Sequence, residues 1–398
     1  MWILFWIILI ILLILFLGWL DFTLGRKSHH RNLRFYDFKK TKGDYNFYSN
    51  GSTLFDDMFE DIRCARESVE VLFFIVKTDD LSMHFLDLLQ SKAKDGVEVK
   101  LVLDRFGSFR ITPRKIREMR EAGIQFAFCE KPSFPYFFYK MNRRNHRKIT
   151  VVDNEIAYVG GYNVGKEYIG KDAIMGDWRD YHLRLKGEVV QELRHVFYDD
   201  WYLATGEEPP SSFPATSTAG QYEVEVCATD GGQLEDIFLS LIDQAEEELL
   251  IGTPYFIPSQ RLFEGVLNAI QRGVDVKVIL PLKADHAFVK EAGLPYLTRV
   301  VKEGGEVHFF DAGFYHAKVI MVDGRLCDIG TANFDRRSLF LNKEVNTLIY
   351  DEPFIRDLRE TFLEDFESGR PLTEEWIRNR PFITKVNSGI GYLLRPFY

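Results

Sequence analysis

The first twenty residues carry no charged side chain, whereas every later stretch of the chain mixes apolar and polar positions. Twenty helical residues at about 1.5 Å each span about 30 Å, which matches the hydrocarbon core of a bilayer. A secretory signal peptide would need basic residues before a shorter apolar stretch and a small-residue cleavage site after it, and neither is present. The pattern therefore predicts a retained transmembrane anchor over residues 1–21.

Basic residues follow the predicted anchor within residues 22–44: Arg26, Lys27, Arg31 and Arg34. Basic residues beside a transmembrane segment favour the cytoplasmic side, and they attract anionic headgroups. We therefore expect a basic juxtamembrane linker over residues 22–44. The N-terminus is expected outside the cell, with everything after the anchor in the cytoplasm.

Beyond this linker, helical and strand patterns alternate along the chain. Apolar residues at helical spacing predict an amphipathic helix over residues 55–68 and another helix over 81–93. Apolar runs rich in β-branched and aromatic residues predict strands at 69–76 and 97–103. The alternation is typical of the α/β class.

Residues 207–220 are rich in Pro, Ser and Thr, which indicates a linker between a first domain over 45–206 and a second over 221–398. Blocks of the first domain return in the same order in the second: GVEVKLVLD (96–104) as GVDVKVILP (273–281), EAGIQFAF (121–128) as EGGEVHFF (303–310), and HRKITVVD (146–153) as HAKVIMVD (316–323). Similar blocks in one order predict a duplicated unit.

The third block carries the same polar residues in both copies: His146, Lys148 and Asp153 in the first, and His316, Lys318 and Asp323 in the second. Residues two apart on a strand share a face, so we expect each His and Lys to project together from a strand. Each Asp falls in a turn and is counted among the catalytic residues of its motif, where we expect it to have mainly an orienting role. A second strand follows at 156–159 or 326–329 and ends in Gly-rich segments that contain Asn163 or Asn333, each an amide donor.

Packed about a pseudo-twofold axis, the two copies would bring two imidazoles together in a cationic pocket that suits phosphate. One imidazole can attack phosphorus while the other protonates the departing oxygen, because a histidine pKa of about 6.5 suits both roles. A metal site is disfavoured, since a lysine beside each histidine repels a cation. A single His-x-Lys is a common strand pattern, but its duplication favours catalysis.

Composition narrows the classes of function. The 398 residues are 46% hydrophobic and 27% charged, which suits two or three globular domains and excludes a disordered or coiled-coil chain. A net charge of −9 disfavours non-specific binding of long nucleic acid. The cysteines form no C-x-x-C pair, so we expect reduced core residues at four positions: Cys64, Cys129, Cys227 and Cys327.

The paired motifs, each followed by G-G-x-N or G-T-x-N, resemble the phospholipase D superfamily and, more specifically, bacterial cardiolipin synthases. Further stretches resemble that subgroup: EVLFFIV (70–76), WRDYHLRLKG (178–187), TPYFIPS (253–259) and GTANFDRRS (330–338). The resemblance extends from about residue 45 to the C-terminus. It implies two phospholipase D-like α-β-α sandwich domains that form a pseudo-twofold unit at the bacterial cell membrane.

The resemblance also implies roles for the matching residues. His146 is expected to become the phosphohistidine, and His316 to protonate the leaving alcohol. The phosphate oxygens would be held by residues from both copies: Lys148, Lys318, Asn163 and Asn333. Asp180 and Glu344 match acidic residues that hydrogen-bond the imidazoles, and the sequence leaves open which acid serves which histidine. No metal or organic cofactor is implied.

Two features depart from the family pattern. Thr331 takes the place of the usual Ser and retains the hydroxyl. The single predicted span replaces the two of many bacterial members, which indicates a minor isoform.

Aromatic and basic residues cluster near both motifs, over residues 134–147, at Phe309 and Phe310, and at Phe314 and Tyr315. They indicate either a packed loop or an interfacial rim with rings at the acyl boundary and cations over headgroups. The tail at 390–398 is a further candidate for this rim.

The activity implied by the resemblance is transfer of a phosphatidyl group from one phosphatidylglycerol to another, giving cardiolipin and glycerol. The expected partners are therefore anionic phospholipids and the membrane, with no nucleic acid and no obligate protein partner. A phospholipase D hydrolase would use the same residues with water as acceptor. The predicted anchor argues against a nuclease of the superfamily, and the two intact motifs argue against a non-enzymatic scaffold.

Overall fold

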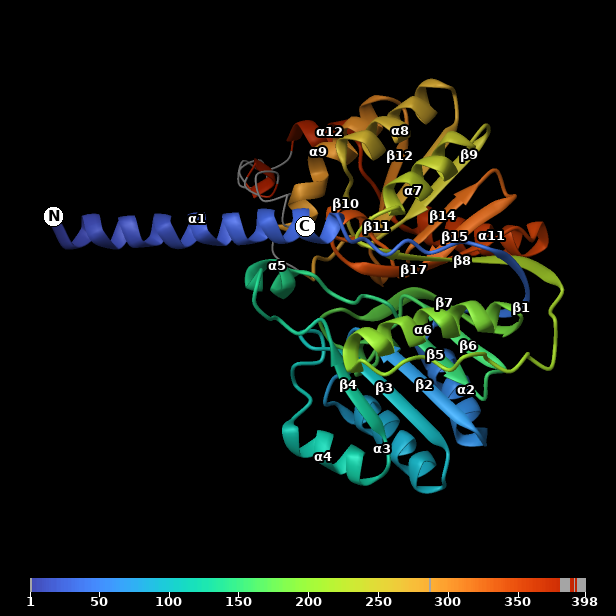
Figure 1. Cartoon of the computed structure of the whole chain (residues 1–398). Coiled ribbons are helices and arrows are strands. Elements are labelled where there is room, and N and C mark those ends of the chain that lie inside the picture. The colour runs from blue at the N-terminus through green and yellow to red at the C-terminus, as the bar shows by residue number, and fades with distance from the viewer. Residues whose placement is uncertain (1, 286–287, 380–386, 390, 392–398) are drawn as a thin grey trace.

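The computed structural model describes residues 2–285, 288–379, 387–389 and 391. Its first element is α1 (Trp2–His30), the one helix in the described residues that is long and apolar enough to cross a membrane. Figure 1 shows α1 leaving the body of the molecule as a long straight helix. The helix continues past the expected anchor, and the first strand already begins at Lys40, so residues 22–44 are largely regular structure rather than a linker.

Two halves of the chain repeat one order of elements. The first half contains β1 (Lys40–Asn50), α2 (Gly51–Cys64), β2 (Ser68–Phe73), α3 (Asp80–Lys94), β3 (Glu98–Asp104), α4 (Pro113–Glu121), β4 (Gln125–Cys129), α5 (Phe137–Asn142), β5 (Ile149–Val152), β6 (Ile156–Gly160), the 3-10 helix η1 (Lys166–Ile169), β7 (Asp177–Gly187) and α6 (Val189–Thr205).

The second half contains β8 (Tyr222–Asp230), α7 (Leu234–Asp243), β9 (Glu248–Gly252), β10 (Phe256–Ile257), α8 (Gln260–Gln271), β11 (Asp275–Pro281), α9 (Val289–Lys302), β12 (Glu306–Phe310), β13 (Gly313–Tyr315), β14 (Val319–Val322), β15 (Leu326–Gly330), β16 (Phe334–Asp335), α10 (Arg336–Phe340), β17 (Lys343–Ile349), α11 (Glu352–Ser368), β18 (Arg370–Pro371) and α12 (Glu374–Asn379).

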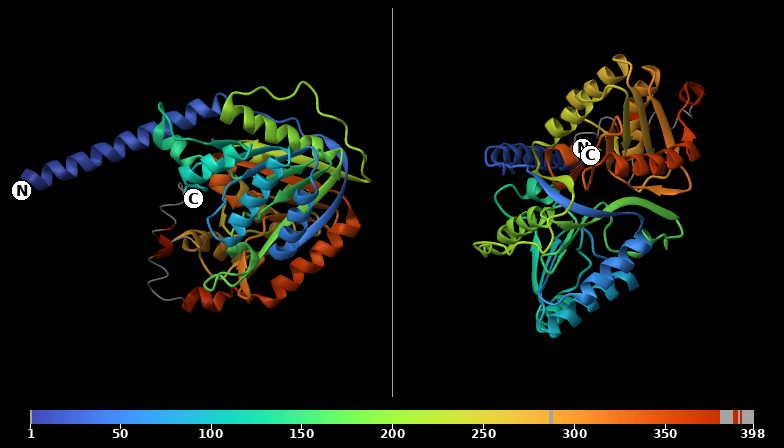
Figure 2. Two further views of the ribbon diagram at one scale, coloured as in Figure 1. Left: turned by 90° about the horizontal axis from the view of Figure 1, so that it is seen from below. Right: turned by 90° about the vertical axis from the view of Figure 1, so that its right-hand side faces the viewer.

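One mixed sheet runs through both halves in the order β18-β12-β11-β9-β14-β15-β17-β8-β1-β7-β6-β5-β2-β3-β4. The order is mirrored about the central antiparallel pair of β1 and β8, which joins Lys40–Gly43 to Tyr222–Glu225. The outer strands β2, β3 and β4 pair in parallel, as do β9, β11 and β12. The fold is therefore a duplicated α/β sandwich with its pseudo-twofold axis near the β1–β8 pair (Figures 1 and 2).

Three apolar cores hold the layers together. The central core packs α6 and α11 against strands of both halves and contains residues such as Phe197, Phe362, Val151 and Ile329. The other two cores lie under the outer helices of each half. Because the central core includes strands of both repeats, the two halves form one packed unit rather than two independent domains joined by a linker.

Local signals explain where the predicted elements begin and end. The helix expected over 55–68 begins earlier, at Gly51, because Asn50 Oδ1 accepts hydrogen bonds from the backbone N–H of Ser52 and Thr53. It ends at Cys64, whose side chain is exposed, so the expectation that all four cysteines are core residues is wrong for this one. The other three are buried.

Candidate active site

Each His-x-Lys segment lies immediately before a strand rather than on it. His146 precedes β5, and its backbone N–H donates to Lys343 O at 2.9 Å. His316 precedes β14, and its N–H donates to Arg179 O at 2.7 Å. The expected strand position is therefore wrong by a few residues, because each segment leaves its own hairpin and bonds to the strand of the opposite repeat.

Each histidine is hydrogen-bonded to an acid of the other repeat. His146 Nδ1 lies 2.9 Å from Glu344 Oε2, and His316 Nδ1 lies 2.5 Å from Asp180 Oδ2. A carboxylate accepts, so each Nδ1 donates its proton and each Nε2 keeps a lone pair for chemistry. This pairing, which the sequence left open, makes each half of the site depend on the other repeat.

The acids are themselves held in place. Glu344 accepts hydrogen bonds from Thr331 Oγ1 at 2.6 Å and from Ser338 Oγ at 2.8 Å. Thr331 thus performs a hydroxyl role that Ser could also perform. Asp180 Oδ1 accepts from the backbone N–H of Tyr181 at 2.8 Å. Fixed carboxylates fix the tautomer and the ring orientation of both imidazoles.

The two motif lysines lie beneath the histidines and are buried. Lys148 Nζ donates to His146 O at 2.6 Å, and Lys318 Nζ lies 3.7 Å from Asp180 Oδ2. Burial lowers the pKa of Lys148 to about 7 and that of Lys318 to about 8. An anion between the histidines would raise both pKa values and so favour the charged form of each lysine.

Burial also governs the titration of the other reacting groups. It lowers the pKa of His146, against the opposing effect of Glu344, and together with Lys318 it lowers the pKa of His316 to about 4. Burial alone would raise the pKa of Asp180 and Glu344, but the neighbouring lysines and histidines outweigh it and hold both below their usual values. At neutral pH the site therefore holds ionised acids and neutral imidazoles.

Both histidines open into one cavity of about 590 Å³, which Asn163 and Asn333 also line. Asn163 Oδ1 accepts from the N–H of Ile75 at 3.2 Å, which fixes the side chain. Asn333 Nδ2 donates to Asp335 Oδ2 at 3.3 Å. The structure thus brings the two histidines and the two asparagines together at a cavity that admits a phosphodiester and more. The motif lysines and the two acids are buried and do not line this cavity: Lys148, Lys318, Asp180 and Glu344.

Asp153 and Asp323 are not brought to this cavity. The carboxylate of Asp153 accepts from the backbone N–H groups of three successive residues, 66–68, at 2.8 to 3.1 Å. Asp323 does the same for residues 246–248. Both residues lie in turns with φ near +50°. Their position makes them anchors for the starts of β2 and β9, not groups that touch a substrate.

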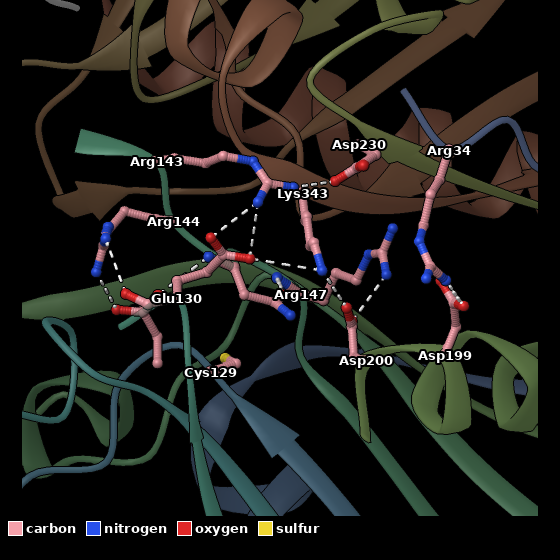
Figure 3. A network of polar contacts seen from close by, with 12 residues as sticks. Arg34, Cys129, Glu130, Arg143, Arg144, Arg147, Asp199, Asp200, Asp230 and Lys343 are labelled. Atoms are coloured by element: carbon pink, nitrogen blue, oxygen red, sulfur yellow. Dashed lines mark hydrogen bonds and ion pairs between the residues drawn. The ribbon is translucent and has the colours of Figure 1, made fainter. Parts of the chain in front are cut away.

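A buried ionic network between the two repeats contains residues that the motifs do not mark (Figure 3). Arg147 Nη1 lies 2.8 Å from Asp200 Oδ2, and Lys343 Nζ lies 2.7 Å from Asp200 Oδ1. Arg147 Nε also donates to Glu344 O at 3.1 Å. The network therefore fixes the backbone that carries the acid of His146. A sequence signal did exist, because the second repeat has Ala317 where the first has Arg147.

The aromatic clusters divide between the two expected alternatives. Four of these residues are buried, which agrees with the packed alternative rather than the interfacial rim: Phe309, Phe310, Phe314 and Tyr315. In the other cluster, covering residues 134–147, Phe134 is 84% exposed and Phe138 41% exposed. The tail at 390–398 lies, apart from Gly391, outside the described residues.

The helix α5 in this cluster packs on the C-terminal part of α1. Tyr139 N–H donates to Asp21 Oδ2 at 3.1 Å, and Tyr139 Oη lies 2.9 Å from His29 Nδ1. Gly25 is buried in this contact, where a Cβ would lie 2.5 Å from Tyr139 Cβ. The continuation of α1 beyond the expected anchor is therefore explained by this docking.

A duplicated α/β sandwich with two histidines at one cavity, each bonded to an acid of the other repeat, is the arrangement of a phospholipase D-like protein. The description "Cardiolipin synthase, PLD-like domain" matches residues 58–201 and 238–366. The chain belongs to this family of cardiolipin synthases with phospholipase D-like domains.

Individual proteins agree with this assignment. The minor cardiolipin synthase ClsB of Bacillus subtilis (strain 168) is 41% identical over 392 residues, which cover 98% of each chain. Cardiolipin synthase 2 of Staphylococcus epidermidis is 36% identical over 90% of this chain and 75% of its own. The crystal structure of phosphatidylserine synthase from Haemophilus influenzae Rd KW20 covers 94% of this chain with a TM-score of 0.71 at 15% identity, which is a likeness of fold.

Proposed function

We propose that this chain is a membrane-anchored cardiolipin synthase that transfers a phosphatidyl group from one phosphatidylglycerol to the terminal hydroxyl of a second. The observation that carries the proposal is the placement of two buried histidines in one cavity, each oriented by the acid of the opposite repeat. Similarity to cardiolipin synthases over nearly the whole chain supports the choice of substrate.

In the first half-reaction, His146 Nε2 attacks the phosphorus of the donor, and the bond from phosphorus to the glycerol oxygen breaks. His316 gives a proton to that oxygen, and glycerol leaves. In the second half-reaction, His316 takes the proton from the acceptor hydroxyl, which attacks the phosphohistidine and releases His146. Protons and electron pairs balance over the cycle, because the proton that leaves with glycerol is replaced by the acceptor's proton.

The remaining site residues stabilise charge and position the imidazoles. Lys148, Lys318, Asn163 and Asn333 supply donors for the phosphate oxygens as negative charge grows on them. Asp180 and Glu344 are positioning residues, since each acts through a histidine. Because a bound phosphodiester raises the pKa of a neighbouring imidazole, substrate binding favours the protonated form that the general acid needs.

We further propose that the N-terminus of α1 lies outside the cell membrane and that both repeats lie in the cytoplasm. The basic residues that follow the apolar part of α1 support this orientation. The exposed Phe134 and Phe138, beside the docked end of α1, would then face the cytoplasmic leaflet.

Lipid product analysis tests the proposed function. Membranes containing the protein, and matched membranes with His146→Ala or His316→Ala, would receive labelled phosphatidylglycerol. Cardiolipin and glycerol that appear only with the unaltered protein are the expected result. Phosphatidic acid without cardiolipin would instead identify a hydrolase. A trapped phosphohistidine located only at position 316 would reverse the assigned roles of the two histidines.

A further inference from the structure

The two halves of the cavity match in their reacting groups but differ in their walls. Two residues before His146 stands Arg144, and the equivalent position before His316 is Phe314. Two residues before Glu344 stands Asn342, and the equivalent position before Asp180 is Trp178. Each histidine has an aromatic neighbour that lines the cavity: the Trp178 ring lies 4.9 Å from the His316 ring, and the Phe74 ring lies 5.0 Å from the His146 ring. The difference is that Arg144 and Asn342 add polar groups to the wall on the His146 side.

A second arginine completes the polar wall. Arg337, from α10, lines the same cavity and donates through Nη2 to Asn142 O at 2.5 Å. Burial lowers its pKa, Asp335 opposes that shift, and Arg144 adds to it. Two guanidinium groups that face one cavity are in mutual repulsion, which an anion between them would relieve.

Arg144 is held rigidly and still has capacity to donate. Its Nη1 donates to Asp104 Oδ1 at 3.0 Å, and its Nη2 donates to Lys140 O at 2.6 Å and to Glu130 O at 3.2 Å. The Arg144 side chain is 7% exposed. Its Nε is buried and has no hydrogen-bond partner in the described part of the chain. A donor left in this state in a cavity wall is suited to a ligand oxygen.

The carboxylates near this wall already accept hydrogen bonds from other groups, and two of them, Asp285 and Asp335, line the cavity themselves. Asp285 accepts from Tyr255 Oη. Asp104 also accepts from the backbone N–H groups of Phe106, Gly107 and Asn145. Asp335 accepts from Ser338 N–H at 2.8 Å and caps α10. Asp104 and Asp335 thus accept hydrogen bonds from donors other than the two arginines. An anion bound to the arginines therefore leaves these two carboxylates with other partners.

The arginines lie toward the membrane helix. Arg337 bonds to the last residue of α5, which packs on α1, and Arg26 of α1 stacks on Phe340 of the arginine's own helix α10. A phospholipid acceptor keeps its acyl chains in the membrane while its terminal hydroxyl reaches the histidines. Its own phosphodiester must then lie between these two points, where the arginines are.

We propose that Arg144 and Arg337 form a second phosphate subsite, which binds the phosphodiester of the acceptor lipid while the donor phosphate lies between the histidines. This inference rests on the proposed function and specifies its acceptor: a lipid alcohol that carries its own phosphate. The subsite selects this acceptor over water and over neutral alcohols, because only the phosphorylated lipid pairs with both guanidinium groups.

The test is a competition between two acceptors in one assay. Full-length protein in membranes would receive labelled phosphatidylglycerol together with 1-butanol, which can accept a phosphatidyl group but carries no phosphate. We expect Arg337→Gln to lower the ratio of cardiolipin to phosphatidylbutanol by about tenfold or more. Arg336→Gln, the same change one residue earlier on α10 at a position that does not line the cavity, should leave the ratio unchanged.

The outcomes separate the subsite from the proposed function. A fall of both products by the same factor, or an unchanged ratio, in Arg337→Gln would overturn the subsite while leaving cardiolipin synthesis intact. Phosphatidylbutanol without any cardiolipin from the unaltered protein would overturn the proposed function and the subsite with it.

A second measurement needs no variant and therefore no assumption about folding. The unaltered protein would be offered phosphatidylglycerol and a monoacylglycerol at equal surface concentration as acceptors. A preference of about tenfold or more for the phosphorylated acceptor is expected. Equal use of the two would overturn the subsite.

Discussion

Glu344 and Asp180 each hydrogen-bond a histidine of the other repeat. Loss of either acid is therefore expected to change the orientation and the pKa of that histidine rather than the packing of the core. Glu344→Gln keeps the shape but removes the charge. We expect kcat to fall by roughly 10²- to 10⁴-fold. Because the carboxylate raises the pKa of His146, its loss also moves the acidic limb of the kcat/KM profile to lower pH. A fall in kcat without this displacement would indicate a merely structural role.

The lysines beneath the histidines set a different pH dependence. The pKa of Lys148 is about 7 and that of Lys318 about 8, so both lose their charge in the empty site as the pH rises through this range. We expect kcat/KM to fall above about pH 7 and more steeply above about pH 8. The fall in kcat should be smaller, because bound phosphate keeps the lysines protonated. Initial rates between pH 6.5 and 9.5 measure both, and a flat kcat/KM across this range would contradict the expectation.

Asp153 belongs to the same motif as His146, but the two residues lie in different places and are expected to have different roles. The Asp153 carboxylate bonds to three backbone N–H groups far from the cavity, so Asp153→Ala should cost about 1–3 kcal/mol of the free energy of unfolding. The kcat of the folded protein should stay within about threefold. Thermal unfolding and an active-site titration measure the two effects, with the exposed Asp357→Ala as control. A large loss of kcat at unchanged stability would restore a catalytic role.

At the scale of elements, the docking of α1 on α5 can be broken at one glycine. A Cβ on Gly25 would lie 2.5 Å from Tyr139 Cβ, whereas a Cβ on Gly18 meets nothing closer than Phe138 Cδ2 at 4.0 Å. Gly25→Leu should therefore weaken docking by about 1–3 kcal/mol, and Gly18→Leu should not. We expect faster tryptic cleavage after Lys140 and reduced lipid transfer only in the first variant. Equal cleavage and equal lipid transfer in the two variants would show that the docking of α1 on α5 does not affect the activity.

Much of the element pattern was accessible from the sequence because hydrophobic periodicity reports burial directly. The predicted helix at 81–93 and strand at 97–103 agree closely with α3 and β3. The His-x-Lys segments were misplaced because a strand pattern does not show where the chain changes partner strand. For Phe309 and Phe314 the sequence left a packed position and an interfacial rim open, since aromatic runs look alike in a core and on a rim.

For the site, the duplication pointed to the paired histidines, lysines and asparagines, but it could not show the exchange of acids between repeats. That exchange depends on the meeting of β7 and β17 with segments of the opposite half, which is a property of the assembled sheet. The positions of Arg337 and Asp200 beside the site were not predicted, and Arg144 was noted only as part of the basic cluster over residues 134–147. A search for repeated residues passes over a position such as Arg144, because the second repeat has Phe314 there.

At the scale of the molecule, neither half contains a complete site, because each histidine lacks its acid without the other half. The halves are also joined by the β1–β8 pair, the central core and the buried Arg147–Asp200–Lys343 cluster. The covalent link between them, residues 206–221, contains no helix or strand, and its first residues are exposed. The physical connection is therefore the interface rather than the linker.

A break in the chain tests this distinction. A protease site inserted between Ser211 and Ser212 should allow cleavage without loss of lipid transfer, because the contacts that align the cross-paired residues survive. Segments 1–211 and 212–398 expressed alone should be inactive, and their co-expression should restore transfer. Loss of activity on cleavage alone would mean that the linker maintains the alignment. Activity in either isolated segment would mean that one histidine suffices and that the exchange of acids is not required.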